Sequence, residues 1–274
     1  MASKISYRSR LAPSPTGYLH IGHALTFWRA QERCRTRHGI LVLRLEDLDR
    51  DRCRPEFREA VFEDLGWFGL QWDEGPFLQS ERRPLYLEAW KHLRNHGLIY
   101  PCSCSRRDAV TAPGAPHAED EEPIYRGTCR PERLTIPQVD DPIGVNWRFR
   151  VPDGEAMQFF DRSAGLQRAI AGVEFGDFVV WRKDGIPAYQ LAVVVDDSAM
   201  RITEVVRGAD LLRSTFRQLL LYRALELDPP DFCHLPLVTD ESGKRLAKRD
   251  DALSLRTLRF RGVAPNEIRR RFAI

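Results

Sequence analysis

The chain has 274 residues, 43% of them hydrophobic and 30% charged, with a formal net charge of +3. This length suits one large α/β unit with an insertion, or two modest domains. No apolar run is long enough to span a bilayer and no signal-peptide pattern opens the chain, so we expect a cytoplasmic monomer without a membrane partner. The net charge alone does not require a nucleic-acid partner, although arginines cluster locally.

The first 45 residues carry the pattern of a βαβ unit. The segment 5–11 is typical of a strand and 23–37 of a helix with one apolar side. The segment 40–45 is almost continuously apolar, as in a strand buried within a parallel sheet. A strand, a turn-rich stretch, a helix and a second strand in this order predict the start of an α/β fold.

Two further helices are predicted before residue 100. The first begins at Pro55 and ends at Gly66, and the second begins at Pro84 and ends at Gly97. The segment 106–124 is rich in proline and acidic residues and reads as a mobile loop by composition.

The α/β character changes near residue 100 and returns near residue 190. We therefore predict an inserted module over 100–186. After it, 191–195 reads as another buried strand, 202–206 as a further β-rich stretch and 212–220 as a helix. A last strand is predicted over 235–238.

The stretch 10–23 reads RLAPSPTGYLHIGH and has the chemistry of a phosphate site. Gly17 and Gly22 allow close approach of the backbone, and a helix beginning here offers free N–H groups and a positive dipole end. The imidazoles of His20 and His23 donate hydrogen bonds to phosphate oxygens without holding a full positive charge. This combination points to ATP.

His20-Ile21-Gly22-His23 and the later Lys244–Arg249 segment, KRLAKR, together resemble the paired signature of class I aminoacyl-tRNA synthetases. Those enzymes carry a His-Ile-Gly-His motif early and a Lys-Met-Ser-Lys-Ser motif late. The first match is complete, whereas the second is degenerate, with Arg245 and Lys248 at its two lysine positions. The resemblance implies a Rossmann-type parallel sheet and ATP bound by His20, Gly22, His23, Arg245 and Lys248.

Three neighbouring motifs resemble the glutamyl branch of that class: RLAPSPTG at 10–17, LRLEDLD at 43–49 and VRGADL at 206–211. The resemblance implies a glutamate pocket whose members are Arg10, Ala12, Ser14, Glu46, Tyr189 and Arg207. Two guanidiniums, Arg10 and Arg207, would grip the side-chain carboxylate, and Glu46 with Tyr189 would hold the α-ammonium. The structural alternatives are an ordinary salt bridge for each arginine and a strand-end cap for Glu46.

Asp196 and Asp197 follow an apolar run, where a place in the pocket and a turn or cap role are equally plausible. Activation of glutamate needs no protein nucleophile, because the substrate carboxylate itself attacks the α-phosphorus of ATP. The catalytic residues implied are His20, His23 and Lys248, which would stabilise phosphate charge together with Mg²⁺.

The predicted module carries Cys102, Cys104 and Cys129, three of the six cysteines. Three thiolates and a fourth ligand suit a tetrahedral structural Zn²⁺ site; buried or free thiols are the alternative. The residues alone suggest His117 or a water as fourth ligand, whereas the resemblance implies Tyr125. A rigid module would turn nearby arginines toward RNA phosphates. These arginines are Arg126, Arg130 and Arg133.

The chain stops at Ile274, soon after the late lysine motif, where full-length glutamyl-tRNA synthetases continue into an anticodon-binding domain. In this it resembles the short glutamyl-Q tRNA(Asp) synthetase family. That resemblance implies transfer of L-glutamate to the queuosine base at the wobble position of tRNA(Asp). We expect catalytic halves at 1–99 and 187–243, the module at 100–186, and a late-motif loop with a truncated helical segment at 244–274.

Three alternatives stay open. The chain is a catalytic fragment of a full-length enzyme that charges tRNA(Glu), an adenylate-forming ligase of the same motif class that acts on a small molecule, or a non-catalytic RNA-binding relative. The last would be expected to carry a broken early motif or to lack Lys248, and the sequence has neither defect.

Overall fold

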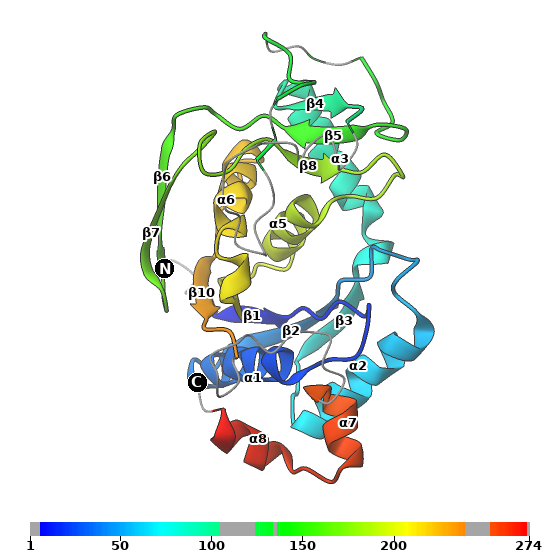
Figure 1. The fold of residues 1–274 in the computed structure, drawn as a ribbon, viewed down its shortest axis with the longest axis vertical. Helices are drawn as coiled ribbons and strands as arrows, with labels where there is room; N and C mark the ends of the chain where they lie inside the picture. Colours follow the sequence, from blue (N-terminus) through cyan, green and yellow to red (C-terminus); the bar gives the residue numbers. More distant parts are fainter. Residues whose placement is uncertain are drawn as a thin grey trace.

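The computed structural model describes residues 6–104, 124–125, 127–133, 136, 138–238 and 253–272. The molecule is elongated, with a small antiparallel sheet at one end and a parallel sheet with its helices at the other (Figure 1). Among the described residues, no helix combines the length and the apolar character needed to cross a membrane.

The N-terminal part is the predicted βαβ unit, extended by one strand. Strands β1 (Arg8–Leu11), β2 (Ile40–Leu45) and β3 (Glu74–Leu78) pair in parallel in that order, joined by α1 (Ile21–Thr36) and α2 (Pro55–Phe68). Successive residues of β2 alternate between two hydrophobic clusters, with the side chain of position 42 in one and those of 41, 43 and 45 in the other. The strand is therefore buried on both faces, as its continuous apolar sequence predicted.

A second sheet holds β9 (Glu204–Gly208), β10 (Asp231–Leu235), β6 (Ala156–Asp161) and β7 (Gly165–Ile170), in the spatial order β7-β6-β10-β9. Strands β9 and β10 run parallel, and β6 and β7 form an antiparallel hairpin added beyond β10. The hairpin comes from the segment 100–186, so this segment contributes strands to the sheet that holds β9 and β10 as well as to the third sheet.

The two sheets meet between β1 and β9. The backbone N–H of Thr203 donates to the carbonyl of Arg8 at 2.9 Å, and the Ser9 hydroxyl donates to the carbonyl of Glu204 at 2.9 Å. Across this joint the strand order is β3-β2-β1-β9-β10. Strands β2 and β3 are therefore added on one side of the β1–β9 pair, and β10 on the other. Such a reversal leaves a crevice at the carboxyl ends of the two central strands, where α/β proteins bind ligands.

The third sheet is antiparallel and consists of β4 (Ile99–Cys102), β5 (Asn146–Phe149) and β8 (Phe178–Trp181). Helix α3 (Arg83–Asn95) leads into it and places Trp90 edge-on against a tryptophan of β5, with ring centroids 4.9 Å apart. This helix follows the predicted course, from the turn before Pro84 to a glycine in the left-handed conformation just beyond its end.

The strand predicted over 191–195 is wrong. These residues lie in α5 (Tyr189–Ala199), a helix in which every side chain from 191 to 197 is buried. It packs against α3, α6 (Ser214–Ala224) and β8 near the middle of the molecule (Figure 1). A helix enclosed on all sides has no polar face, so its short apolar run carries no periodicity that separates it from a buried strand.

Three predicted boundaries shift. Helix α2 continues through Gly66 to Phe68, and the next residue, Gly69, is its left-handed cap with a φ of 84°. Helix α1 begins two residues earlier than predicted. Strand β10 ends at Leu235, where the strand expected over 235–238 was to begin, because Pro236 has no N–H to extend the ladder. The helix predicted over 212–220 is confirmed as α6.

The C-terminal residues pack beneath the first sheet as α7 (Leu255–Phe260) and α8 (Pro265–Arg271). The side chain of Ile268 is buried in the cluster that α1 and α2 form against that sheet. The Arg269 guanidinium lies 3.6 Å above the Trp28 ring. One member of the arginine-rich C-terminal run thus serves packing.

Glu204 links three parts of the fold. Its carboxylate accepts two hydrogen bonds of 2.6 Å from the Arg33 guanidinium of α1 and one of 2.5 Å from the Tyr7 hydroxyl. Burial alone would raise the pKa of the Glu204 carboxyl. The hydrogen bonds from Arg33 and Tyr7, with the charges of Arg33 and Arg37, outweigh burial and hold the pKa below its ordinary value.

We therefore expect Glu204→Gln to lower the free energy of unfolding by roughly 2 kcal/mol at pH 7, because a half-buried guanidinium loses its charged partner. The folded pKa is depressed, so this stabilisation is present above the unfolded pKa and is lost as pH falls below it. Urea unfolding should show a deficit that fades below about pH 4. Glu88→Gln, at an exposed pair with Lys91, is the control; an equal loss there, or a deficit independent of pH, contradicts the account.

Candidate functional site

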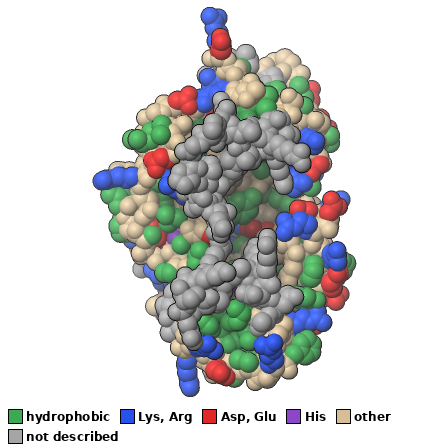
Figure 2. Space-filling view, viewed as in Figure 1, with side chains coloured by type: hydrophobic (Ala, Val, Ile, Leu, Met, Phe, Trp, Pro, Cys, Tyr) green, Lys and Arg blue, Asp and Glu red, His purple; other side chains and the backbone are tan. Residues whose placement is uncertain are grey.

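A cavity of about 730 Å³ opens at the carboxyl ends of β1 and β9. Its lining contains all the early-motif and glutamate-pocket residues that the sequence singled out within the described chain: Arg10, Ala12, Ser14, His20, Gly22, His23, Glu46, Tyr189 and Arg207. The face of the molecule seen in Figure 2 is hollowed at its centre, with hydrophobic side chains on the floor of the hollow. The fold therefore brings these distant positions to one site.

The two histidines of the early motif lie side by side at the start of α1. His20 is the N-cap: its Nδ1 accepts from the backbone N–H of Gly22 at 3.1 Å, while Nδ1 of His23 accepts from the backbone N–H of His20 at 3.4 Å. Because each Nδ1 accepts, the neutral rings carry their proton on Nε2. A Cβ on Gly22 would lie 3.0 Å from the His20 ring, so a larger residue here would require that ring to shift by a few tenths of an ångström.

Arg10 and Glu46 join the first motif to the rest of the cavity. The Arg10 side chain is 4% exposed; it donates through Nη1 to the carbonyl of Val206 at 3.1 Å, and its Nε lies 3.4 Å from Asp197. The backbone N–H of Glu46 donates to the carbonyl of Pro13 at 2.9 Å, which fixes the turn after β1 against the end of β2. The salt-bridge alternative for Arg10 is thus realised in part.

Arg44 forms a buried ionic cluster that the sequence analysis missed. Its guanidinium is fully enclosed and donates to Asp197 at 2.6 Å and to Glu46 at 3.1 Å, with Asp196 at 3.8 Å. Asp196 in turn accepts from Arg82 at 2.6 Å. The available signal was a single cation inside the otherwise apolar strand ILVLRL.

Of the carboxylates in the cluster, Glu46 lines the cavity, whereas Asp196 and Asp197 are not among its lining residues. Burial alone would raise the pKa of Asp197, but the charges of Arg44 and Arg10 lower it below its usual range. Burial raises the pKa of Glu46, and the same two arginines offset only part of that effect. Asp196 and Asp197 therefore lie in a buried helix as ion-pair partners, and neither serves as a turn or cap.

Arg207, unlike Arg44, is held by neutral hydrogen-bond partners. Its Nε donates to Nε2 of His234 at 2.9 Å and its Nη2 to the Thr215 hydroxyl at 2.9 Å. Among the described residues, no carboxylate lies within 4.0 Å of this guanidinium. Burial lowers the pKa of Arg207, although Tyr189 opposes the effect, and the nearby charge of Arg10 lowers it further. The charge of Asp197 also acts on Arg207 from beyond contact distance and opposes the lowering of its pKa. A buried cation without a carboxylate in direct contact is well placed to receive an anionic group.

The late motif, with Arg245 and Lys248, lies outside the described residues. The two described residues nearest to it that line the cavity are Val238 before it and Ser254 after it. The backbone on the far side is anchored to the early motif, since the N–H of Leu255 donates to the carbonyl of Leu19 at 2.8 Å. Described residues on either side of the segment 239–252 therefore line the cavity.

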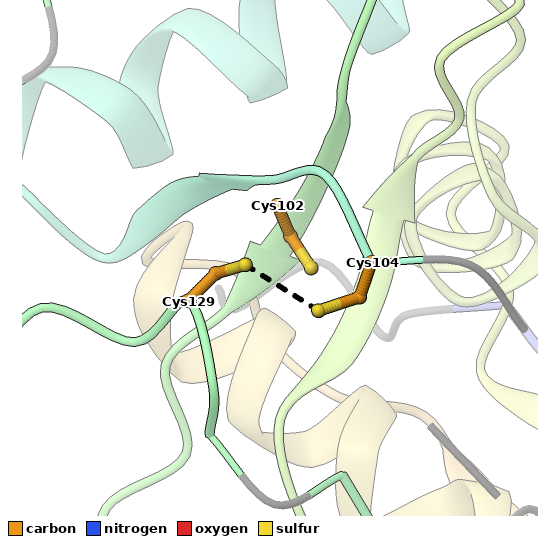
Figure 3. A group of neighbouring side chains, drawn as sticks. All are labelled: Cys102, Cys104 and Cys129. Atoms are coloured by element: carbon orange, nitrogen blue, oxygen red, sulfur yellow. Dashed lines mark hydrogen bonds between the residues drawn. The ribbon is translucent and has the colours of Figure 1, made fainter. Parts of the chain in front are cut away.

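The three cysteines of the inserted segment converge at a second site. Their sulfur atoms lie within 4.8 Å of one another and point toward a common centre (Figure 3). The Tyr125 hydroxyl is 3.4 Å from the sulfur of Cys102 and 3.3 Å from that of Cys104. A tetrahedral zinc site separates its sulfurs by about 3.8 Å, so this donor set fits such an ion. His117, the other candidate ligand, lies outside the described residues.

The arginines near the cysteines have structural contacts. Arg148 lies 3.8 Å above the Tyr125 ring and donates to the sulfur of Cys102 at 3.3 Å. Arg130, which was expected to face RNA, forms ion pairs with Asp153 at 3.0 Å and Asp177 at 3.3 Å. Arg126 lies outside the described residues.

Several glutamyl enzymes are similar to this chain. A glutamyl-Q tRNA(Asp) synthetase of Nitratidesulfovibrio vulgaris is 46% identical over 93% of this chain and 82% of its own length, and one of Symbiobacterium thermophilum is 46% identical over 94% and 83%. A glutamate–tRNA ligase of Hydrogenobaculum is 40% identical, and the chain spans 56% of it.

A solved structure of a glutamate tRNA ligase is also similar to this chain. The glutamate tRNA ligase of Elizabethkingia meningosepticum, in complex with its amino acid, superposes with a TM-score of 0.76 at 29% identity; the match covers 89% of this chain and 52% of that one. The family model for class I tRNA synthetases (E and Q), catalytic domain, matches residues 6–272. The chain therefore belongs to the class I tRNA synthetases of the E and Q family and is a ligase.

Proposed function

We propose that this chain activates L-glutamate with ATP and transfers the glutamyl group to the queuosine base at the wobble position of tRNA(Asp). The observation that carries the first half is the single cavity lined by both early-motif histidines and both arginines of the glutamate pocket. The second half is supported by three relatives, 44–46% identical, that bear the corresponding name.

The electrostatics of the cavity favour glutamate over neutral amino acids. Arg207 offers a guanidinium that has no described carboxylate in direct contact, and Arg10 lies beside it, so a side-chain carboxylate gains charge-assisted hydrogen bonds there. Glu46, whose pKa burial raises, gains an opposite charge when an α-ammonium binds. Tyr189 supports the ammonium, and the turn with Ala12 and Ser14 completes the pocket.

Activation requires placement of two reactants and stabilisation of phosphate charge. A carboxylate oxygen of glutamate attacks the α-phosphorus of ATP, the bond to the bridging oxygen breaks, and pyrophosphate leaves. His20 and His23 donate through Nε2 to phosphate oxygens at the N-terminus of α1. In this proposal Arg245 and Lys248 also bind the phosphates, because described residues on either side of their segment line the cavity, and Mg²⁺ accompanies the phosphates.

Transfer then consumes the adenylate. A hydroxyl oxygen of the RNA attacks the glutamyl carbonyl carbon, an ester forms, and AMP leaves. Charging of tRNA(Glu) is the rival destination, supported by 38–42% identity to glutamate–tRNA ligases of which the chain spans 55–56%. The two destinations differ in the RNA and in the nucleotide that carries the label.

The test is to incubate the protein with labelled glutamate, ATP and tRNA(Asp), with and without queuosine. We expect label only on queuosine-containing tRNA, and nuclease digestion should release it with the anticodon nucleotide. tRNA(Glu) is the matched control. Label on the 3′ adenosine of tRNA(Glu) contradicts the proposed destination, and labelled adenylate without any RNA product indicates the small-molecule alternative.

The cysteine site is proposed to hold one structural zinc ion through Cys102, Cys104, Tyr125 and Cys129. Metal analysis of protein purified without chelators should give about one zinc per chain. Cys102→Ser should lower that content severalfold, whereas Cys53→Ser, at an isolated cysteine, should not. Metal-free wild-type protein, or full zinc content in the Cys102 variant, overturns the ligand set.

A further inference from the structure

A buried histidine lies behind the arginine of the proposed glutamate pocket. His234, on β10, is 1% exposed, and its Nε2 lies 2.9 Å from Nε of Arg207 on the neighbouring strand β9. The two buried arginines that line the cavity differ in their partners: Arg10 has Asp197 at 3.4 Å, whereas Arg207 has only neutral acceptors among the described residues. The contacts that His234 makes on its other side give a reason for this difference.

The proton of His234 is fixed by Asp161. Nδ1 of the imidazole lies 2.6 Å from the fully buried Asp161 carboxylate, which also accepts from the backbone N–H groups of Ser163 at 2.9 Å and Ala164 at 2.8 Å. A carboxylate held by these donors acts only as an acceptor, so Nδ1 must carry the hydrogen. Nε2 is then left with its lone pair, which matches the N–H of Arg207 that points at it.

Protonation of this histidine is opposed by its surroundings. Burial and the charge of Arg207 lower the pKa of His234 to about 4, although Asp161 opposes the shift. At neutral pH the imidazole is therefore uncharged. It directs the guanidinium through a hydrogen bond and leaves the positive charge intact, which a carboxylate at the same position would cancel.

The remaining contacts of Arg207 agree with an orienting role. Its Nη2 donates to the Thr215 hydroxyl, which itself lies 3.3 Å from Nε2 of His234. Nη1 donates to no described residue, and the side chain lines the cavity. Two nitrogens are thus fixed from behind, and the third is available to a ligand.

We infer that His234, with its tautomer set by Asp161, is a positioning residue for glutamate specificity, because it orients Arg207 toward the cavity without neutralising it. The inference rests on the proposed function, in which Arg207 binds the side-chain carboxylate. It extends the site from the cavity wall through β10 to the end of β6, which belongs to the segment 100–186.

Three variants separate the hydrogen-bond role from simple packing. His234→Leu removes the acceptor. Asp161→Asn offers an amide donor to Nδ1, which favours the other tautomer and sets an Nε2–H against the N–H of Arg207. His234→Gln keeps an acceptor oxygen and should restore function. Asp231→Asn, at an exposed pair with Arg162 near the start of the same strand, is the matched control.

The assay is ATP–pyrophosphate exchange, with and without tRNA(Asp). We expect His234→Leu and Asp161→Asn to raise the KM for glutamate roughly 10- to 100-fold, as expected for loss of a hydrogen bond to a charged group. The KM for ATP should stay within about twofold, and His234→Gln should recover most of the loss. Long-range proton–nitrogen spectra should show His234 protonated on Nδ1 in the wild type and on Nε2 in Asp161→Asn.

The outcomes distinguish failure of the proposed function from failure of the inference about His234. A wild-type protein without glutamate-dependent exchange overturns the proposed function and this inference with it. Exchange in the wild type with an unchanged glutamate KM in Asp161→Asn overturns the inference alone, as does an equal rise in both KM values. If His234→Leu does not fold, the comparison of Asp161→Asn with His234→Gln decides, because the first disrupts the acceptor and the second retains one.

Discussion

The fully buried guanidinium of Arg44 is the interaction on which the cavity depends. It connects the end of β2 to α5 through Asp197 and Asp196 and also holds Glu46, while Asp197 is shared with Arg10. The connected cluster contains three guanidiniums and three carboxylates: Arg10, Arg44, Arg82, Glu46, Asp196 and Asp197. Because its charges balance, removal of any one member leaves the cluster with a net charge, so the cluster fixes side chains from four segments in one arrangement.

Against that balanced cluster, Arg207 stands out as a buried positive charge with neutral partners. Such a site favours a ligand that supplies a carboxylate to the guanidinium. It also disfavours a ligand that fills the same space without supplying a negative charge. Glutamine is nearly isosteric with glutamate, but its amide would leave the guanidinium without a counter-charge in a place that water reaches poorly. The neutral ring of His234 orients Arg207, and the Asp161 carboxylate contacts the histidine rather than the guanidinium.

The sequence predicted most of the fold and the members of the cavity, and the exceptions have physical causes. The βαβ start could be predicted because β2 is apolar on both faces. The early motif could be predicted because its residues are contiguous in the sequence and match the class I signature completely. The apolar run 191–195 carried no period, so a helix enclosed on all sides was read as a strand. Arg44 and His234 were missed because a lone polar residue in an apolar strand shows its partners only after distant segments have come together.

The central claim is that an oriented Arg207, which has no carboxylate in direct contact among the described residues, makes this cavity selective for a carboxylate side chain. Its most direct test is the ratio of kcat/KM for glutamate to that for glutamine in ATP–pyrophosphate exchange by the wild-type protein. The account predicts a preference for glutamate on the order of 10³ or more, because glutamine would leave a buried cation unpaired. A glutamine value within about tenfold of the glutamate value would contradict it.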